Sequence, residues 1–133
     1  MMNVQKTRRS ESGASAVEFA LLLPVLMMIL FGIIEFGLAL YRQAILTNAS
    51  REGARLGIVQ SSPPITAAAV DTVIDNYLGP AGIPPATVSR NIVGVPGSVT
   101  GAPVIVTLTL PYTPITKFIS PINLVARTEM RHE

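Results

Sequence analysis

A run of apolar residues near the N-terminus constrains this chain more than any other feature. The stretch Phe19–Ile34 has no charged side chain, and in Ala14–Tyr41 the only carboxylates are those of Glu18 and Glu35. At 1.5 Å per residue, a helix over Ala14–Tyr41 reaches about 42 Å, whereas the hydrocarbon layer of a bilayer is about 30 Å thick. The sequence therefore predicts one transmembrane helix.

The polar residues on either side of the apolar run predict its orientation. Residues 1–13 carry three basic side chains against one acidic side chain, directly before the span. Arg42, Arg51 and Arg55 follow the span, but on a helix that we expect to continue outside the membrane. Basic residues close to a span favour the cytoplasmic side, and a long domain crosses the membrane largely regardless of its charge. We therefore expect a single-pass protein of the bacterial cytoplasmic membrane, with its N-terminus cytoplasmic and its C-terminus extracytoplasmic.

Cleaved export signals are the first alternative to a permanent anchor, and they fit poorly. The apolar run is too long for a secretory signal, and Gly37-Leu38-Ala39 is a weak cleavage site that follows Glu35. Arg8-Arg9 resembles the start of a twin-arginine signal, but the polar residues Ser10-Glu11-Ser12 follow it instead of apolar ones.

The rest of the chain predicts a small domain that contains one helix and several strands. The stretch Arg42–Leu56 lacks proline, so the first helix is expected to run to Gly57. Apolar residues at i, i+3 and i+4 spacing predict a second helix over Pro64–Leu78, with Asp71 and Asp75 on its solvent face.

Period-two alternation in the last third predicts strands over Thr87–Val93, Val104–Tyr112 and Leu124–Arg131. The Gly- and Pro-rich segments between them are typical of connections in an antiparallel sheet. The expected fold is α+β: a long transmembrane helix, then a small domain with one helix and about three antiparallel strands. We divide the chain into a basic cytoplasmic leader (1–13), a transmembrane and extended helix (14–57) and an extracytoplasmic domain (58–133).

Composition argues against several classes of function. There is no cysteine, and the single histidine, His132, is expected to be exposed, so we predict no catalytic residues, no metal site and no cofactor. Asp71 and Asp75 could bind a hard cation, but two carboxylates on a wet helix face are usually structural. Residues 59–133 hold four basic and four acidic side chains, so this domain lacks the basic surface of a nucleic-acid binder.

One motif at the start of the apolar run points to a family. Gly13-Ala14-Ser15-Ala16-Val17-Glu18-Phe19 follows a basic leader and resembles a type IV prepilin cleavage site. Together with Phe31-Gly32-Ile33-Ile34-Glu35-Phe36-Gly37 and Thr47-Asn48-Ala49-Ser50-Arg51-Glu52-Gly53-Ala54-Arg55, the motif is similar to the TadE-like pseudopilins of tight-adherence (Tad) pili.

The resemblance implies a pseudopilin or minor pilin that helps to assemble an adhesive pilus and is not an enzyme. Prepilin peptidase would cut between Gly13 and Ala14, which would make Glu18 the fifth and Phe19 the sixth residue of the mature chain. Other pilin-like subunits and the pilus assembly platform would be its partners.

Several of these residues also have plainer explanations. Glu18 could simply lie at the lipid headgroups, where an acid also suits a helix N-terminus. Glu35 could pair with Arg42 or with a partner subunit, or could reach water at the outer end of the span. Arg51, Glu52 and Arg55 fit a helix interface, but such charges are also common on a solvated helix face. The alternative function is an uncleaved single-span protein whose outer domain is a binding module.

Overall fold

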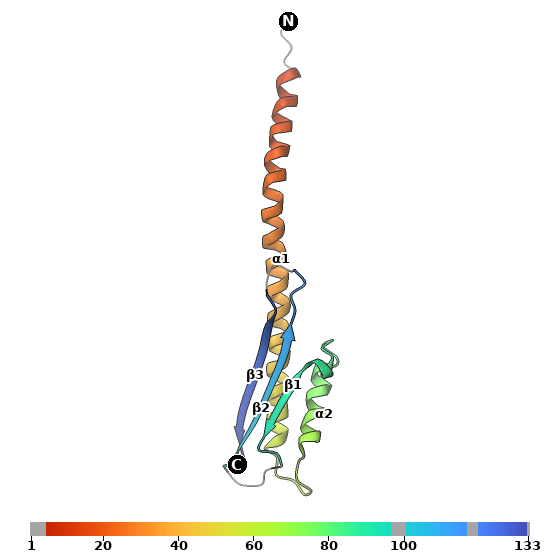
Figure 1. Cartoon of the computed structure of the whole chain (residues 1–133), viewed down its shortest axis with the longest axis vertical. Coiled ribbons are helices and arrows are strands. Elements are labelled where there is room, and N and C mark those ends of the chain that lie inside the picture. Colours follow the sequence, from red (N-terminus) through yellow and green to blue (C-terminus); the bar gives the residue numbers. More distant parts are fainter. Residues whose placement is uncertain (1–4, 97–100, 117–119, 133) are drawn as a thin grey trace. The chain divides into compact units, whose positions relative to one another are not determined.

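The computed structural model describes residues 5–96, 101–116 and 120–132, with side chains described from residue 13 onward. Its elements, shown in Figure 1, are α1 (Gln5–Gly57), α2 (Ala67–Leu78), the 3-10 turn η1 (Pro85–Thr87), β1 (Ser89–Val93), β2 (Pro103–Tyr112) and β3 (Ile122–Arg131). The predicted α+β fold is confirmed: a long apolar helix, one further helix and three antiparallel strands. Parts of the two predicted connections between strands, residues 97–100 and 117–119, lie outside the described residues.

The chain divides into two compact units, one up to Phe36 and one over Gly37–Glu133. In the first unit, α1 continues through Pro24 and its large apolar side chains are exposed. Among the described residues, α1 is the one helix that is long and apolar enough to cross a membrane, with a mean hydropathy of 2.6 in its most apolar window. The second unit, residues 37–133, contains the hydrophobic core, and from here on we call this second unit alone the compact unit.

The sheet of the compact unit has the strand order β1-β2-β3, with both neighbouring pairs antiparallel. Ser89 lies opposite Thr109, and Tyr112 lies opposite Ile122. Alternation along β2 buries the face that the sequence predicts, and its members are Val104, Val106, Leu108, Leu110 and Tyr112. The period-two pattern thus separates a core face from an outer face.

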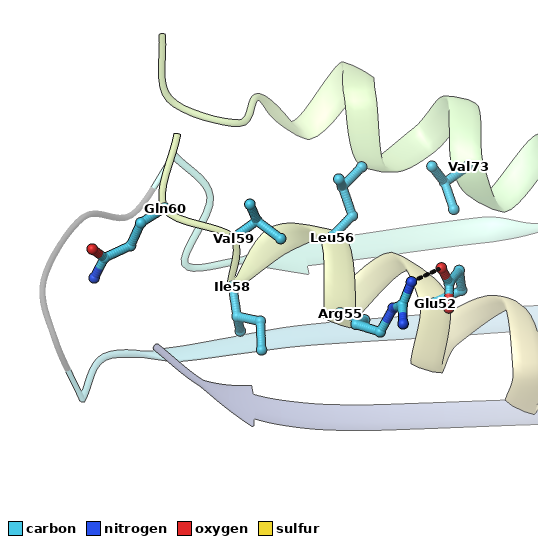
Figure 2. Close-up of a pocket in the computed structure, with 7 residues that line it drawn as sticks. All are labelled: Glu52, Arg55, Leu56, Ile58, Val59, Gln60 and Val73. Carbon is cyan, nitrogen blue, oxygen red and sulfur yellow. Dashed lines mark ion pairs between the residues drawn. The ribbon is translucent and has the colours of Figure 1, made fainter. Parts of the chain in front are cut away.

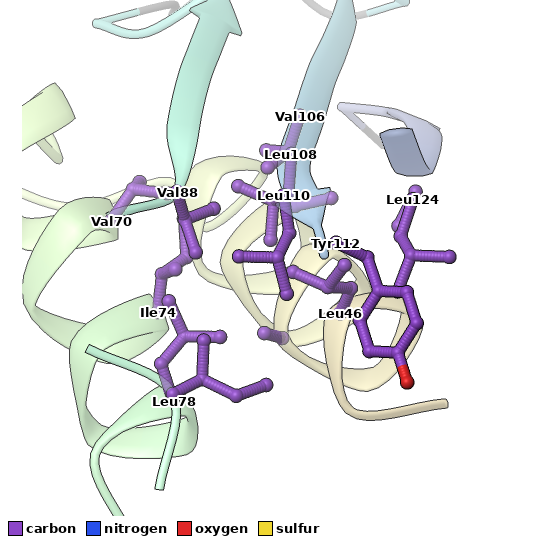
Figure 3. Close-up of a cluster of buried hydrophobic side chains, with 14 of the residues drawn as sticks. Leu46, Val70, Ile74, Leu78, Val88, Val106, Leu108, Leu110, Tyr112 and Leu124 are labelled. Carbon is purple, nitrogen blue, oxygen red and sulfur yellow. The ribbon is translucent and has the colours of Figure 1, made fainter. Parts of the chain in front are cut away.

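The core of the compact unit lies between the sheet and the helices. Figure 3 shows buried side chains from three elements pointing toward one another: Leu46 of α1, Ile74 of α2 and Leu108 of β2. Leu46 is fully buried, so the part of α1 after Phe36 belongs to this core. The predicted boundary at residue 58 divides the chain according to which side of a membrane each part occupies. The structure contains no membrane, so that boundary stays a prediction.

Two glycines allow α1 to approach its neighbours closely. A Cβ atom on Gly57 would lie 2.8 Å from Cγ1 of Val104, and one on Gly53 would lie 3.2 Å from side-chain atoms of Ile74 and Val70. Both glycines are buried. The small residues near the end of α1 therefore set the distance between α1 and the elements that cover it.

Element boundaries differ from the predictions where a local signal stops the chain from continuing. Helix α2 begins at Ala67 and not at Pro64, because Thr66 caps it by accepting a hydrogen bond from the amide of Ala69. Strand β1 begins at Ser89, since Thr87 ends a 3-10 turn in which its hydroxyl donates to the carbonyl of Pro84 at 2.7 Å.

Candidate functional site

The predicted cleavage motif lies on the exposed surface of α1. Every side chain over residues 13–19 is exposed, including those of Ala14 and Glu18, and Phe19 retains 60% of its accessible surface. No heavy atom lies within 4 Å of the position that a Cβ atom would take on Gly13. The side chains of the motif therefore lie on the surface of the described chain.

Glu35 differs from Glu18 because its side chain is buried, with only 4% of its surface exposed. It also takes part in a polar interaction. Buried carboxylates need such a partner, since desolvation of an isolated charge costs several kcal/mol.

The stretch Thr47–Arg55 contains both a buried residue that contacts the sheet and charged residues at the surface. Ser50 is fully buried, and its hydroxyl donates to the carbonyl of Thr47 at 2.9 Å and lies 2.8 Å from the hydroxyl of Thr128 on β3. Ser50 thus ties α1 to the last strand of the sheet. Of the charged residues in the stretch, Arg51 and Arg55 are exposed and Glu52 is partly exposed.

Two of the predicted interface residues line an open groove at the end of α1. Glu52 and Arg55 form an ion pair of 3.2 Å, with 34% and 72% of their side chains exposed. The groove has a volume of about 580 Å³ (Figure 2), and its lining also includes the apolar residues Leu56, Ile58, Val59 and Val73. An exposed ion pair contributes at most about 1 kcal/mol to stability, so its charges remain available to a partner. Arg51 does not line this groove.

Asp71 and Asp75 lie on the solvent face that the sequence predicts, with 41% and 44% of their side chains exposed, and both also contact Arg90. Both accept hydrogen bonds from the guanidinium of Arg90 on β1, at 3.2 Å for Asp71 and with a shorter bond to Asp75. Burial alone would lower the pKa of Arg90, but the hydrogen bonds and charges of Asp75 and Asp71 outweigh it and raise that pKa. The pair is therefore a clamp between α2 and β1, and its structural explanation holds.

His132 is buried, with 2% of its surface exposed, so the expectation that it is exposed is wrong. The backbone of His132 extends the β2–β3 pairing, since its amide donates to Ala102 and its carbonyl accepts from Gly101. The imidazole faces the same side as Met130, which is the helix side of the sheet. Within the described part of the chain, no group of three or more His, Cys, Asp or Glu residues could hold a metal ion.

The fold places two arginines in surroundings that the sequence analysis did not predict. Arg90 was recognisable in principle, because a single arginine follows two aspartates that lie four residues apart on a helix. Arg42 was not recognisable in this way: its guanidinium lies 5.1 Å from the centroid of the Tyr112 ring, and only the register of β2 brings that ring to α1.

Comparison with known proteins gives one match. A family model described as TadE-like protein matches residues 13–55, which is the stretch from the glycine of the predicted cleavage motif to the arginine of the groove. No curated protein and no solved structure matches the chain.

Proposed function

Residues 13–55 are TadE-like, and from this premise we propose that the chain is a pseudopilin or minor pilin that helps to assemble an adhesive Tad pilus. The family match itself supports the coarser statement that the protein is associated with a Tad pilus. The single observation that carries the finer proposal is the Gly13–Phe19 motif, which lies fully exposed at the head of an apolar helix. A segment in this position is accessible both to a membrane peptidase and to the helices of other subunits.

The first step of the proposed function is removal of the leader. Prepilin peptidase cuts after Gly13, which releases residues 1–13 and leaves Ala14 as the new N-terminus. The new α-amino group is a cation at neutral pH, since such amines titrate near ~8. Cleavage therefore places a positive charge four residues before Glu18.

The second step is pairing between subunits. A carboxylate such as that of Glu18 costs about 2.5–3.5 kcal/mol at the centre of a bilayer and less near its edge. The Ala14 ammonium of a neighbouring subunit offsets this cost, because at about 4 Å and an effective dielectric constant of ~20 the attraction is on the order of 4 kcal/mol before desolvation. Glu18 thus favours association of processed helices over isolated ones.

The compact unit would supply the second contact surface of the subunit. The groove beside Glu52 and Arg55 is open, partly apolar and rimmed by an ion pair that solvent screens. We propose that this groove, together with the neighbouring exposed Arg51, contacts another pilin-like subunit or the assembly platform.

Mass spectrometry of the membrane-extracted protein tests the processing step. In cells with an active prepilin peptidase, the mature chain is expected to begin at Ala14, and Gly13→Leu is expected to retain the leader. Gly32→Leu is the matched control, because Gly32 is also an exposed glycine of α1 with no atom within 4 Å of a Cβ position. A wild-type chain that keeps residues 1–13 would instead favour an uncleaved single-span protein with a binding module.

Glu18→Leu tests the pairing step separately. The variant is expected to insert into membranes and to lose its leader, but to fail to co-purify with partner pilins. Glu11→Leu is the control, since Glu11 leaves with the leader. Normal piliation of cells that carry a cleaved Glu18→Leu protein would place the glutamate merely at the headgroups.

The orientation of the chain has its own test. Because the chain has no cysteine, Asn91→Cys introduces a unique thiol at an exposed position of β1. A membrane-impermeant thiol reagent is expected to label it from outside intact cells. Labelling only after the membrane is broken would reverse the proposed topology.

A further inference from the structure

The compact unit contains a second, smaller pocket just after the apolar run of α1 ends. The pocket has a volume of about 210 Å³, and among its lining residues are Arg42, Ile83, Thr87, Leu110, Pro111 and Thr113. Pockets for whole small molecules typically measure about 300–1,000 Å³. This pocket therefore suits one small chemical group and not an entire metabolite.

The charge of the pocket comes from Arg42. Of the described residues that line it, Arg42 alone is charged. Within the described part of the chain, its guanidinium lies against the ring of Tyr112 but takes part in no hydrogen bond or ion pair. A guanidinium has five N–H donors, and contact with an aromatic face leaves them available. The hydroxyl of Thr113, at an exposed position, adds a further possible donor.

The position of Arg42 along the helix indicates where this charge lies in a membrane. From Ala14 to Arg42 the helical rise is about 42 Å, and a bilayer with its headgroups is about 40–45 Å thick. The preceding residue, Tyr41, is half exposed, and exposed tyrosines at this level are typical of the membrane–water interface. A span that begins at Ala14 would therefore end near Arg42, at the level of the lipid phosphates.

We propose that this pocket binds the phosphate group of an anionic phospholipid at the end of the span nearer the compact unit. Arg42 binds the phosphate oxygens through its paired N–H donors, which match phosphate geometry. Leu110 and Ile83 form the apolar wall beside the headgroup. The inference uses the membrane span of α1 but not its role in a pilus, so either can fail without the other.

A lipid-binding measurement on the full-length chain tests this site. The protein, purified in detergent, is mixed with equal amounts of phosphatidylglycerol and phosphatidylcholine, and the retained lipids are counted by native mass spectrometry. The wild type is expected to prefer phosphatidylglycerol about tenfold, as one charge-assisted site allows. Arg42→Gln is expected to abolish the preference, and Arg42→Lys is expected to keep part of it because the charge remains without the planar fork.

Two further variants separate a specific pocket from general attraction between charges. Arg51→Gln removes an exposed arginine of the same helix outside this pocket, and it is expected to leave the preference unchanged. Thr87→Glu keeps Arg42 but adds a carboxylate at an exposed position of the lining, and it is expected to abolish the preference without disturbing the core. Equal losses in Arg42→Gln and Arg51→Gln, or a full preference in Thr87→Glu, would overturn the proposal.

Two other outcomes would assign the pocket to a different anion. If inorganic phosphate displaces phosphatidylglycerol at equal concentration, the site recognises free phosphate and not a lipid. If Arg42→Gln retains its lipid preference but no longer co-purifies with other subunits, the pocket binds a carboxylate of a partner protein.

Discussion

Leu22 and Leu46 lie on the same helix and have opposite surroundings. Leu22 keeps 65% of its surface exposed, whereas Leu46 is fully buried. In the first unit the large apolar side chains of α1 are exposed, and in the compact unit apolar side chains of α1 form part of a core. Soluble proteins rarely expose such a large apolar surface. The comparison shows that one helix meets two different requirements, burial by surroundings outside the chain up to Phe36 and burial by its own domain afterwards.

Replacement of one leucine in each region by alanine is expected to give the largest difference in the free energy of unfolding. Leu46→Ala is expected to lower the free energy of unfolding of the compact unit by about 2–5 kcal/mol, because it leaves a cavity in the core. Leu22→Ala is expected to leave that value unchanged. Hydrogen exchange of the β2 amides measures both effects, and an equal response of the two variants would abolish the distinction between the regions.

A new charge is expected to have a large effect in the first unit and little effect in the compact unit. Leu26→Arg, in the middle of the apolar run, is expected to disfavour membrane insertion by about 2.5–3.5 kcal/mol. Val125→Arg, at a half-exposed position of β3, is the control and is expected to insert normally. The measurement is the fraction of protein that resists alkaline extraction from membranes. Full resistance of Leu26→Arg would show that this stretch is not the anchor.

Replacement of a glycine of α1 by alanine is also expected to affect stability differently in the two regions. Gly57→Ala is expected to destabilise the compact unit by about 1–3 kcal/mol, because the new Cβ would lie 2.8 Å from the buried side chain of Val104. Gly32→Ala has open space around it and is expected to have no destabilising effect. Thermal unfolding in detergent, followed by the exchange of the strand amides, compares the two. A neutral Gly57→Ala would mean that α1 and β2 can move apart without loss.

Arg90→Gln should have the smallest effect of the four. It leaves Asp71 and Asp75 near each other without their cation, and a loss of about 1–2 kcal/mol is expected after allowance for their partial exposure. Arg127→Gln is the control, since its pair with Glu129 is 3.8 Å long and exposed.

The same clamp makes a prediction about alkaline pH. The pKa of Arg90 is raised in the folded state. Its stabilising contribution is therefore complete below the pKa that the arginine has in the unfolded chain, and it is lost only as the pH rises through the higher folded value. The free energy of unfolding is measured at pH 7 and pH 10 for the wild type and for Arg90→Gln, and both proteins are expected to change equally between the two pH values. A decrease at pH 10 that occurs in the wild type and not in Arg90→Gln would contradict this.

The sequence was sufficient for features that depend on local pattern. The apolar run, the end of α1 at Gly57 and the buried face of β2 all follow from periodicity and from single residue types. The family resemblance of residues 13–55 likewise rests on a continuous stretch. Features that depend on pairing between distant segments were beyond such reasoning. Burial of His132 and the contact of Arg42 with Tyr112 both arise from the strand register and from how the sheet covers α1.

Pairing between distant segments also determines when the domain can be completed during synthesis. The side chain of Gln43 donates to the carbonyl of Val125, and Ser50 meets Thr128, so these bonds join residues 82 and 78 positions apart. Contacts of such wide separation form late, because a long loop must close first. Since a chain emerges from the ribosome N-terminus first, the core face of α1 around Leu46 stays uncovered until β2 and β3 have been made. The nascent chain thus exposes the apolar core face of α1 for most of its synthesis. A chaperone that covers this face is expected to raise the yield of folded protein.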